Sequence, residues 1–404
     1  MLDCGTGNSD LLARTVGWTR DAFDADALMQ TALRRAGRGT FSDTSFVEPL
    51  KRLLAAYEAE ADLSAFGRYA VRFDMLRCLN NLLCLDAAEA SDPGITRHPI
   101  ERPLFITGLP RSATTFLHTL LAQDPGHAAP RCWQLIYPYS ASRLGARLRR
   151  AQVGFQLCVF RLFSPGLDEL HPMSADAPQE CTDITAQVFQ SLRFDSTHRI
   201  PSYQKWLDAH GHEAAFRFHR RFLQHLDAQR PGRRWVLKSP DHVFALRAIR
   251  AAYPDARIVF LHRDPLSVVA SCVKLAEMLR RPFTRHLDLS EVGSQVSSRL
   301  VESTVRMTQA AAADPAIMHL HYREVTSSPM ETVGKLYRYC GIPLENDAEA
   351  RMRRWLGLAA PAHRPRYSLE EFGLNASDLR ARFARYMQVF DIAPEWKGAG
   401  APNT

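Results

Sequence analysis

Two hydrophobic runs separated by a helical pattern constrain the fold of this chain more than any other feature. The run RWVLKS (234–239) is followed by the helix-like segment DHVFALRAIRAAYP and then by ARIVFLHR (256–263). Short apolar runs of this kind are typical of buried strands. Strands joined by a helix are parallel, because the connection returns the chain to the starting end of the sheet. The sequence therefore predicts an α/β fold with a central parallel sheet flanked by helices.

The rest of the chain adds helices around this sheet. Apolar residues recur at helical spacing from Ala22 to Ala90, and a short run at Leu104–Thr107 begins a strand. The segment 140–230 has the pattern of helices with loops, IMHLHYREV (317–325) predicts a fourth strand, and the chain is helical nearly to its end. We expect a helical N-terminal region over 1–98, packed on an α/β domain over 99–392, and a C-terminal tail over 393–404.

The stretch FITGLPRSATTFLHTLL (105–121) has the sequence pattern of a phosphate-binding loop between a strand and a helix. Aligned on Gly108, the Walker pattern would require a second glycine and a lysine, but Ala113 and Thr114 stand there. What remains is P-loop-like: a turn followed by a helix whose N–H groups and hydroxyls can hold one phosphate. Arg111 adds a positive charge. The same residues would also suit an ordinary capped helix.

Two further groups lie where predicted strands end, which is where ligands bind in open α/β sheets. Arg263 ends the strand RIVFL, and Ser267 and Ser271 share one face of the next helix. Together they could grip a second anion, although a surface Arg263–Asp264 pair with capping serines would look the same. Lys238 ends WVLK and could equally be a strand-end lysine whose amine reaches solvent.

The chain resembles the sulfotransferases that use 3′-phosphoadenosine 5′-phosphosulfate (PAPS). The resemblance rests on the order of two segments along the chain, PRSATT (110–115) and 237–271, the second of which contains Lys238. The chain is most similar to a bacterial branch with a P-R-S-G-T-T-type loop, related to tyrosylprotein sulfotransferases. The segments HPMSADAPQEC (171–181), HYREVTSSPMETVGKLYRYCGIPL (321–344) and RYSLEEFGL (366–374) are also similar. The resemblance extends from about residue 25 to 392.

The resemblance implies a donor site with two phosphate positions. The loop would bind the 5′-phosphosulfate, and a strand-end arginine with a helix serine would bind the 3′-phosphate. A C-terminal segment would close over the nucleotide. The implied donor-binding residues are Pro110, Arg111, Ser112, Ala113, Thr114, Thr115, Arg263, Ser271, Tyr322, Arg366, Tyr367 and Ser368.

The implied reaction moves a sulfuryl group from PAPS to a hydroxyl or amine of an acceptor, leaving adenosine 3′,5′-bisphosphate (PAP). Transfer of this kind is an in-line displacement catalysed chiefly by positioning and charge. A cationic side chain can replace a metal ion, so we expect Arg111 and Lys238 to be catalytic and no metal to be needed. The acceptor would be a small molecule, a glycan or a lipid.

The acceptor must lose a proton, and the residues expected to take it are replaced in this chain. Small-molecule sulfotransferases place a histidine where Pro240 stands, and bacterial relatives commonly have a glutamate where Gln134 stands. His171 and Glu180 are the remaining candidates, with Asp176 behind them. His171 could instead cap a helix, and Glu180 could be a solvated helix residue.

Ala113 is a second departure from the family, because relatives usually carry glycine at this position. A methyl group there resists a positive φ and crowds an approaching phosphate. Alanine would cost nothing if this backbone is helical, and donor affinity would suffer if it is not.

Composition excludes several other classes of protein. The formal charge is +8, but only six of 51 basic residues are lysines and the arginines are dispersed, so we expect no nucleic-acid partner. The eight cysteines form no metal-ligand or disulfide pattern, and no stretch is long and apolar enough for a transmembrane segment. We expect a cytoplasmic protein and leave a homodimer open.

Two alternative functions stay open beside an active transferase. A catalytically impaired nucleotide-binding member of the family would explain the missing bases, and a P-loop small-molecule kinase would need the absent lysine. The arginine-flanked segment 143–163 could cover a lipidic or aromatic alcohol, although a packing helix with exposed arginines is the favoured interpretation.

Overall fold

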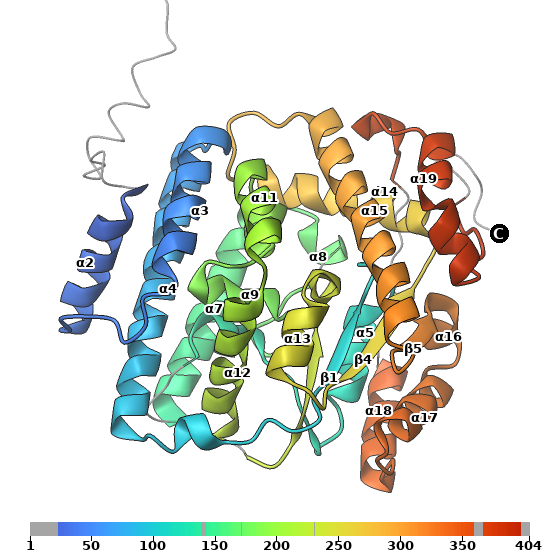
Figure 1. Ribbon diagram of the computed structural model, residues 1–404, viewed down its shortest axis with the longest axis horizontal. Coiled ribbons are helices and arrows are strands. Elements are labelled where there is room, and N and C mark those ends of the chain that lie inside the picture. The colour runs from blue at the N-terminus through green and yellow to red at the C-terminus, as the bar shows by residue number, and fades with distance from the viewer. Residues whose placement is uncertain (1–22, 139–142, 171, 230, 359–366, 397–404) are drawn as a thin grey trace, which may run out of the picture.

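The structure is a computed structural model that describes residues 23–138, 143–170, 172–229, 231–358 and 367–396. A central sheet lies between a helical N-terminal part on one side and the last helices of the chain on the other (Figure 1). This arrangement confirms the predicted α/β class.

The sheet has five strands in the order β2-β3-β1-β4-β5, and every neighbouring pair is parallel. The strands are β1 (Leu104–Gly108), β2 (His127–Ala128), β3 (Arg234–Lys238), β4 (Arg257–His262) and β5 (Met318–His321). Ile106 of β1 is in register with Lys238, and Gly108 with Leu261. The carboxyl ends of β1, β3 and β4 therefore meet at one edge of the sheet.

Alternate residues of the strands pack on opposite faces, as the pleat of a sheet requires. On one face, Leu104 and Ile106 join a hydrophobic cluster with residues of the helices α5 (Thr114–Leu121), α17 (Pro329–Cys340) and α18 (Asn346–Leu358). On the other face, Phe105 and Phe260 belong to a larger cluster that continues into the N-terminal helices. The sheet is thus buried on both sides, which explains why its strands are apolar runs without polar alternation.

The helices follow the chain from the N-terminal part to the C-terminal part. Before β1 lie α2 (Ala25–Ala36), α3 (Val47–Glu60), α4 (Ala65–Ser91) and the 3₁₀-helix η2 (Ile95–Arg97). Between β1 and β3 lie α5 (Thr114–Leu121), α6 (Cys132–Ile136), α7 (Arg143–Phe163), α8 (Leu167–Leu170), α9 (Thr182–Thr185), η3 (Ala186–Val188), α10 (Arg193–Thr197), α11 (Pro201–His210) and α12 (Glu213–Asp227). Beyond β3 lie η4 (Pro240–Phe244), α13 (Leu246–Ala252), α14 (Pro265–Arg280), α15 (Leu289–Ala313), α16 (Tyr322–Ser327), α17 (Pro329–Cys340), α18 (Asn346–Leu358), η5 (Glu370–Phe372) and α19 (Ala376–Val389).

Three parts of the fold differ from the sequence-based expectation. The strand expected over 317–325 ends at His321, and α16 begins at Tyr322 because the following residues lose the apolar character of a buried strand. The helix expected after β3 is split into η4 and α13 at Ala245, which has φ −121° and ψ 15°. The two-residue strand β2 was not expected, since it is too short to leave a pattern.

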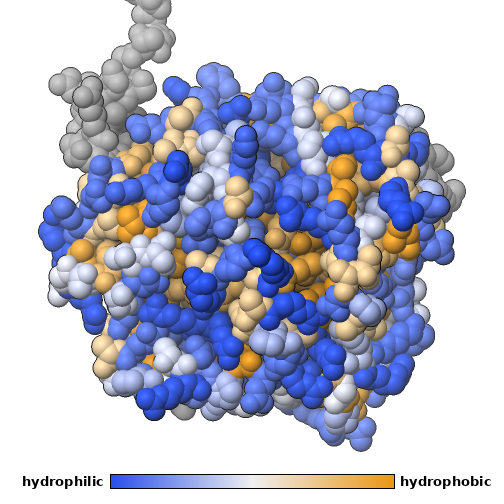
Figure 2. All heavy atoms as spheres, in the orientation of Figure 1, coloured by the Kyte–Doolittle hydropathy of each residue, from blue (hydrophilic) through white to orange (hydrophobic). Residues whose placement is uncertain are grey.

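Hydrophilic residues dominate the face seen in Figure 2, with hydrophobic residues scattered between them. Among the described residues, no helix is both long enough and apolar enough to cross a membrane. The predicted domain boundaries at residues 98 and 392 stay predictions.

Candidate functional site

The carboxyl ends of β1, β3 and β4 carry most of the predicted site residues, and β1 supplies the tightest turn. Gly108 ends β1 with φ 119°, and a Cβ there would lie 2.3 Å from the carbonyl oxygen of Leu261. Only glycine fits this close approach of two strands. The chain then leaves the sheet through residues 109–113 and enters α5, as the sequence predicted.

The loop between β1 and α5 has two non-glycine residues in the left-handed conformation. Arg111 has φ 61° and Ala113 has φ 66°. Ser112 between them is fully buried and donates its hydroxyl to the carbonyl oxygen of Leu109 at 2.7 Å. Ser112 therefore braces the loop. Ala113 therefore has the positive φ that its methyl group resists, and the expected loss of donor affinity stays a prediction.

The Arg111 side chain joins the loop to two helices. Its Nε donates to Oγ of Ser271 at 3.0 Å, and its Nη1 donates to the carbonyl oxygen of Leu170 at 2.7 Å. Ser271 lies on α14 and Leu170 ends α8. The structure thus brings together two residues that the sequence placed at separate phosphate positions.

Arg263 follows β4 and lies against the same loop. Its Nη1 donates to the carbonyl oxygen of Arg111 at 2.7 Å, and its guanidinium stacks 3.9 Å from the ring centroid of Tyr322. Its Nε lies 3.1 Å from a carboxylate oxygen of Glu395. Only 17% of the Arg263 side chain is exposed. Tyr322 therefore belongs to the site through its ring.

The neighbouring Asp264 does not pair with Arg263, contrary to the alternative left open by the sequence. Asp264 is 1% exposed and caps α14 by accepting from the backbone N–H of Leu266. The Ser267 hydroxyl and the backbone N–H groups of Glu395 and Trp396 also donate to it, at 3.1, 2.9 and 2.7 Å. Asp264 thus fastens the chain at residues 395–396 beside Arg263.

Lys238 ends β3 and is 1% exposed, so its ammonium needs a partner. Its Nζ lies 2.5 Å from a carboxylate oxygen of Glu180 and 3.3 Å from Oγ1 of Thr115. The backbone N–H of Cys181 donates to the carbonyl oxygen of Lys238 at 3.0 Å. A buried strand-end lysine, a helix-start threonine and one of the two candidate bases therefore meet at one point.

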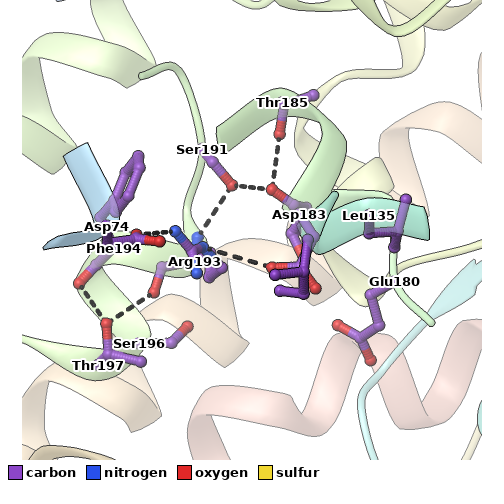
Figure 3. A network of polar contacts seen from close by, with 12 residues as sticks. Asp74, Leu135, Glu180, Asp183, Thr185, Ser191, Arg193, Phe194, Ser196 and Thr197 are labelled. Carbon is purple, nitrogen blue, oxygen red and sulfur yellow. Dashed lines mark hydrogen bonds and ion pairs between the residues drawn. The ribbon is translucent and has the colours of Figure 1, made fainter. Parts of the chain in front are cut away.

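A half-buried ionic network fixes the segment that follows Glu180 (Figure 3). Arg193 bridges Asp74 at 2.5 Å and Asp183 at 3.5 Å, and Arg77 also binds Asp74. Burial raises the pKa of Asp183. Burial also opposes the ionised form of Asp74, but its two arginines outweigh that effect and hold its pKa well below the usual range. Asp183 lies in the first turn of α9, so the network anchors the helix that follows Glu180.

A second set of buried contacts holds α6, which carries Gln134. The Asn81 amide donates to the carbonyl oxygen of Ile136 and to Gln187, both at 2.9 Å. Gln187 in turn donates to the carbonyl oxygen of Leu135 at 2.9 Å. These amides lock α4, α6 and η3 together.

Gln134 and Pro240, at the two positions where the family resemblance implies a base, have structural roles in this chain. The Gln134 side chain accepts from the backbone N–H of Arg131 at 3.0 Å and caps its own helix. Pro240 begins η4, and its carbonyl oxygen accepts from the Thr107 hydroxyl at 3.2 Å. Of the two remaining candidates, Glu180 lies at the site, whereas His171 lies outside the described residues. Asp176 pairs with Arg150 of α7.

The remaining predicted donor residues fall into three groups. Pro110 is half-buried in the loop, Thr114 is buried, and Thr115 is exposed. Tyr367 is close enough to Arg111 and Glu169 for both to act on its pKa, which burial raises above its usual value. Ser368 donates to the Glu370 carboxylate at 2.7 Å, and its hydroxyl accepts from the backbone N–H of Glu371 at 3.3 Å. Arg366 lies outside the described residues.

Two acidic residues of this region were not singled out from the sequence. The first is Glu395, whose carboxylate forms an ion pair with Arg263. The second is Asp241, whose pKa is raised to about 7 by burial and by the negative charge of Glu180. The sequence around Glu395 contains no pattern that would predict this role, because its partner Arg263 is 132 positions away. Asp241 stands directly after Pro240 and could have been noticed for that reason.

The sequence was compared with known families and relatives. Residues 103–346 match the model of the sulfotransferase family. The chain is 24% identical over 262 residues to the omega-hydroxy-beta-dihydromenaquinone-9 sulfotransferase Stf3 of Mycobacterium bovis and of Mycobacterium tuberculosis. This match covers 63% of the chain and 66% of the relative, so the chain spans just under two thirds of the relative's length.

The fold was compared with solved structures. It is similar to that of sulfotransferase STF1 from Mycobacterium tuberculosis, with 29% identity, a TM-score of 0.80, and coverage of 91% of this chain and 100% of that chain. Sulfotransferase STF9 from Mycobacterium avium has 28% identity and a TM-score of 0.83, with coverage of 94% and 99%.

Proposed function

The chain belongs to the sulfotransferase family, and we propose from this premise that it transfers a sulfuryl group from PAPS to a hydroxyl of an acceptor. The observation that carries the proposal is the meeting of Lys238, Thr115 and Glu180 beside the β1–α5 loop. This point combines a fixed cation, a helix amino terminus and a carboxylate, which are the groups that sulfuryl transfer requires.

The 5′-phosphosulfate would lie on the loop 109–115. The amino terminus of α5 supplies backbone N–H groups for an anion, and Arg111 and Lys238 supply positive charge from two sides. Arg111 would have to exchange its present contacts with Ser271 and Leu170 for the donor, or hold them while the donor approaches. Two cationic side chains and backbone N–H groups are suited to bind the negatively charged phosphosulfate.

The 3′-phosphate would lie at Arg263, with Ser271 and the ring of Tyr322 nearby. The fit of this position is supported by Glu395, because Arg263 already holds an anionic oxygen of that side chain. A guanidinium that binds a carboxylate has the geometry to bind a phosphate. Recognition there would distinguish PAPS from ATP, which lacks a 3′-phosphate.

In the proposed reaction, the acceptor oxygen forms a bond to sulfur while the bond from sulfur to the 5′-phosphate oxygen breaks, which releases PAP. Lys238 and Arg111 would stabilise the negative charge on the leaving phosphate oxygen. Glu180 would take the acceptor proton. Its contact with Lys238 would hold the carboxylate in place beside the loop.

The acceptor is proposed to be a hydroxylated, largely apolar molecule. The support comes from the Stf3 relatives, whose name states that they sulfate a hydroxylated menaquinone. The half-buried carboxylates and the buried amides behind Glu180 would keep the base fixed while such an acceptor binds. Glutamine at position 134 would then be compatible with activity, because Glu180 replaces the usual glutamate.

The proposal is tested by donor binding and then by transfer. PAP should raise the melting temperature, while ATP at equal concentration should not; the absence of any shift with PAP would contradict the donor assignment. Arg111→Ala and Lys238→Ala should each abolish transfer from PAPS and leave the circular dichroism spectrum unchanged. Full rates in both variants would refute the catalytic pair.

A further inference from the structure

Helix α7 exposes a continuous apolar stripe that the core does not use. Leu144, Leu148, Phe155 and Leu162 are 66%, 63%, 70% and 80% exposed. The exposed Ala151 and Cys158 fall between them, so the stripe repeats at steps of four and three residues along the helix. Residues at this spacing lie on one face of a helix. The sequence favoured a packing helix with exposed arginines, and the exposed apolar stripe is a feature that this interpretation did not predict.

The apolar surface continues onto α4. The rings of Phe66 and Phe163 stack at 4.5 Å, so the start of α4 lies beside the end of α7. Tyr69 and Phe73 follow Phe66 on the same side of α4 and are 52% and 43% exposed. Of the ten large hydrophobic residues exposed in the described part of the chain, seven belong to α4 and α7. We call this surface the α4–α7 face.

Arginines border the stripe along α7 on both sides. Arg147, Arg150 and Arg161 precede stripe residues by one position, and Arg149 follows one. The sequence of α7 contains five arginines and no acidic residue. Arg150 and Arg161 pair with Asp176 and Asp168 at its edge, while Arg147 is exposed. Apolar side chains between arginines suit a surface that is apolar inside and negatively charged at its boundary.

A second copy of the chain fits this face poorly. Two α7 helices packed on one another would bring five arginines of each helix together without an acidic partner on either helix. A bilayer of anionic lipids offers both complements, with acyl chains for the leucines and phenylalanine and headgroups for the arginines. At 21 residues, α7 is about 32 Å long, enough for a broad interfacial contact.

We propose that the α4–α7 face docks on the surface of an anionic lipid bilayer, with α7 lying in the interface. The position of α7 would bring the site close to the membrane. It leads directly into α8, whose last residue, Leu170, accepts from Arg111. Arg161 donates to the carbonyl oxygen of Met173 at 2.6 Å, in the segment that leads to Glu180. Docking does not depend on the proposed transferase activity.

Vesicle co-sedimentation of the full chain tests the proposal. The wild type should bind vesicles containing phosphatidylglycerol at least about tenfold more tightly than vesicles of phosphatidylcholine alone, and salt should weaken the binding. Phe155→Gln combined with Leu162→Gln should weaken binding about tenfold or more. Leu358→Gln is the matched control, because Leu358 on α18 is 80% exposed, as Leu162 is; it should bind as the wild type does.

Charge is tested separately by Arg147→Gln, which should weaken binding to anionic vesicles, with the exposed Arg354→Gln of α18 as its control. Leu148→Gln repeats the apolar test near the other end of the stripe, should the double variant fold poorly. The proposal is overturned if the wild type does not bind anionic vesicles, or if Leu358→Gln weakens vesicle binding as much as the double variant does. It is also overturned if sedimentation velocity shows a dimer that Leu162→Gln dissociates while no vesicle binding occurs.

Discussion

The ammonium of Lys238 lies 2.5 Å from the carboxylate of Glu180, in a position where the lysine is almost fully buried. The pair joins the end of β3 to the segment preceding α9. It is the most specific feature of the candidate site, because a buried charge must have a partner and this partner is also the candidate base.

Glu180→Gln should lower the rate of sulfuryl transfer by about 10² to 10⁴ while leaving the affinity for PAP nearly unchanged. The amide keeps a hydrogen-bond acceptor for Lys238 but cannot take a proton. The rate is measured with an acceptor that the wild type sulfates. Glu324→Gln is the matched control, since Glu324 pairs with Lys335 and is 26% exposed against 25% for Glu180. Equal rates in the wild type and Glu180→Gln would exclude Glu180 as the base.

Ala113→Gly should stabilise the fold by about 0.5 to 1 kcal/mol, because glycine adopts φ 66° without the steric cost that a methyl group carries. Urea unfolding measures the change. Ala122→Gly provides the comparison, since Ala122 has a right-handed φ of −70° and its replacement should destabilise. A lower stability of Ala113→Gly would show that the methyl group packs too well to be lost.

Glu395→Gln should tighten PAP binding about tenfold, because it removes a carboxylate from the arginine that is proposed to bind the 3′-phosphate. Its backbone contact with Asp264 is preserved. Calorimetric titration gives the dissociation constant, and the exposed Glu371→Gln serves as the control. Weaker binding in Glu395→Gln would mean that this carboxylate supports the donor site.

Asp241→Asn should stabilise the protein in a pH-dependent way. Burial raises the pKa of Asp241 from about 4 in the unfolded chain to about 7 in the folded protein. The wild type therefore loses stability as the pH rises through that range. Asparagine cannot ionise. The free energy of unfolding of the variant minus that of the wild type should therefore grow between about pH 4 and 7 and then level off.

Denaturant unfolding at a series of pH values measures this difference. Asp26→Asn is a suitable control, because Asp26 is 63% exposed in a loose ion pair with Lys51. A difference that stays constant with pH would contradict the shifted pKa of Asp241.

The sequence predicted the elements that have strong local patterns. The strands at Leu104, Arg234 and Arg257 and the helix TTFLHTLL appear where expected, because buried parallel strands and their crossover helices each leave a periodicity of their own. Arg111, Lys238 and Arg263 could be located because strand ends of a parallel sheet share one edge.

Contacts between distant segments could not be predicted. The pair of Arg263 with Glu395 joins residues far apart in the sequence, and the bridge from Arg193 to Asp74 spans 119 positions. The conformation of Ala113 was left open for another reason, since it depends on how the loop closes over β1. The exposure of the α7 stripe depends on which neighbours cover the helix.

The most direct test of the donor site compares PAP with adenosine 5′-phosphate by calorimetric titration, in the wild type and in Arg263→Gln. The wild type should bind PAP at least about tenfold more tightly than the monophosphate, and Arg263→Gln should lose most of that preference. The ratio of the two affinities isolates the 3′-phosphate even if the variant loosens the loop at Arg111. A wild type that binds the two nucleotides equally, or an Arg263→Gln variant that keeps the full preference, would contradict the proposed donor site.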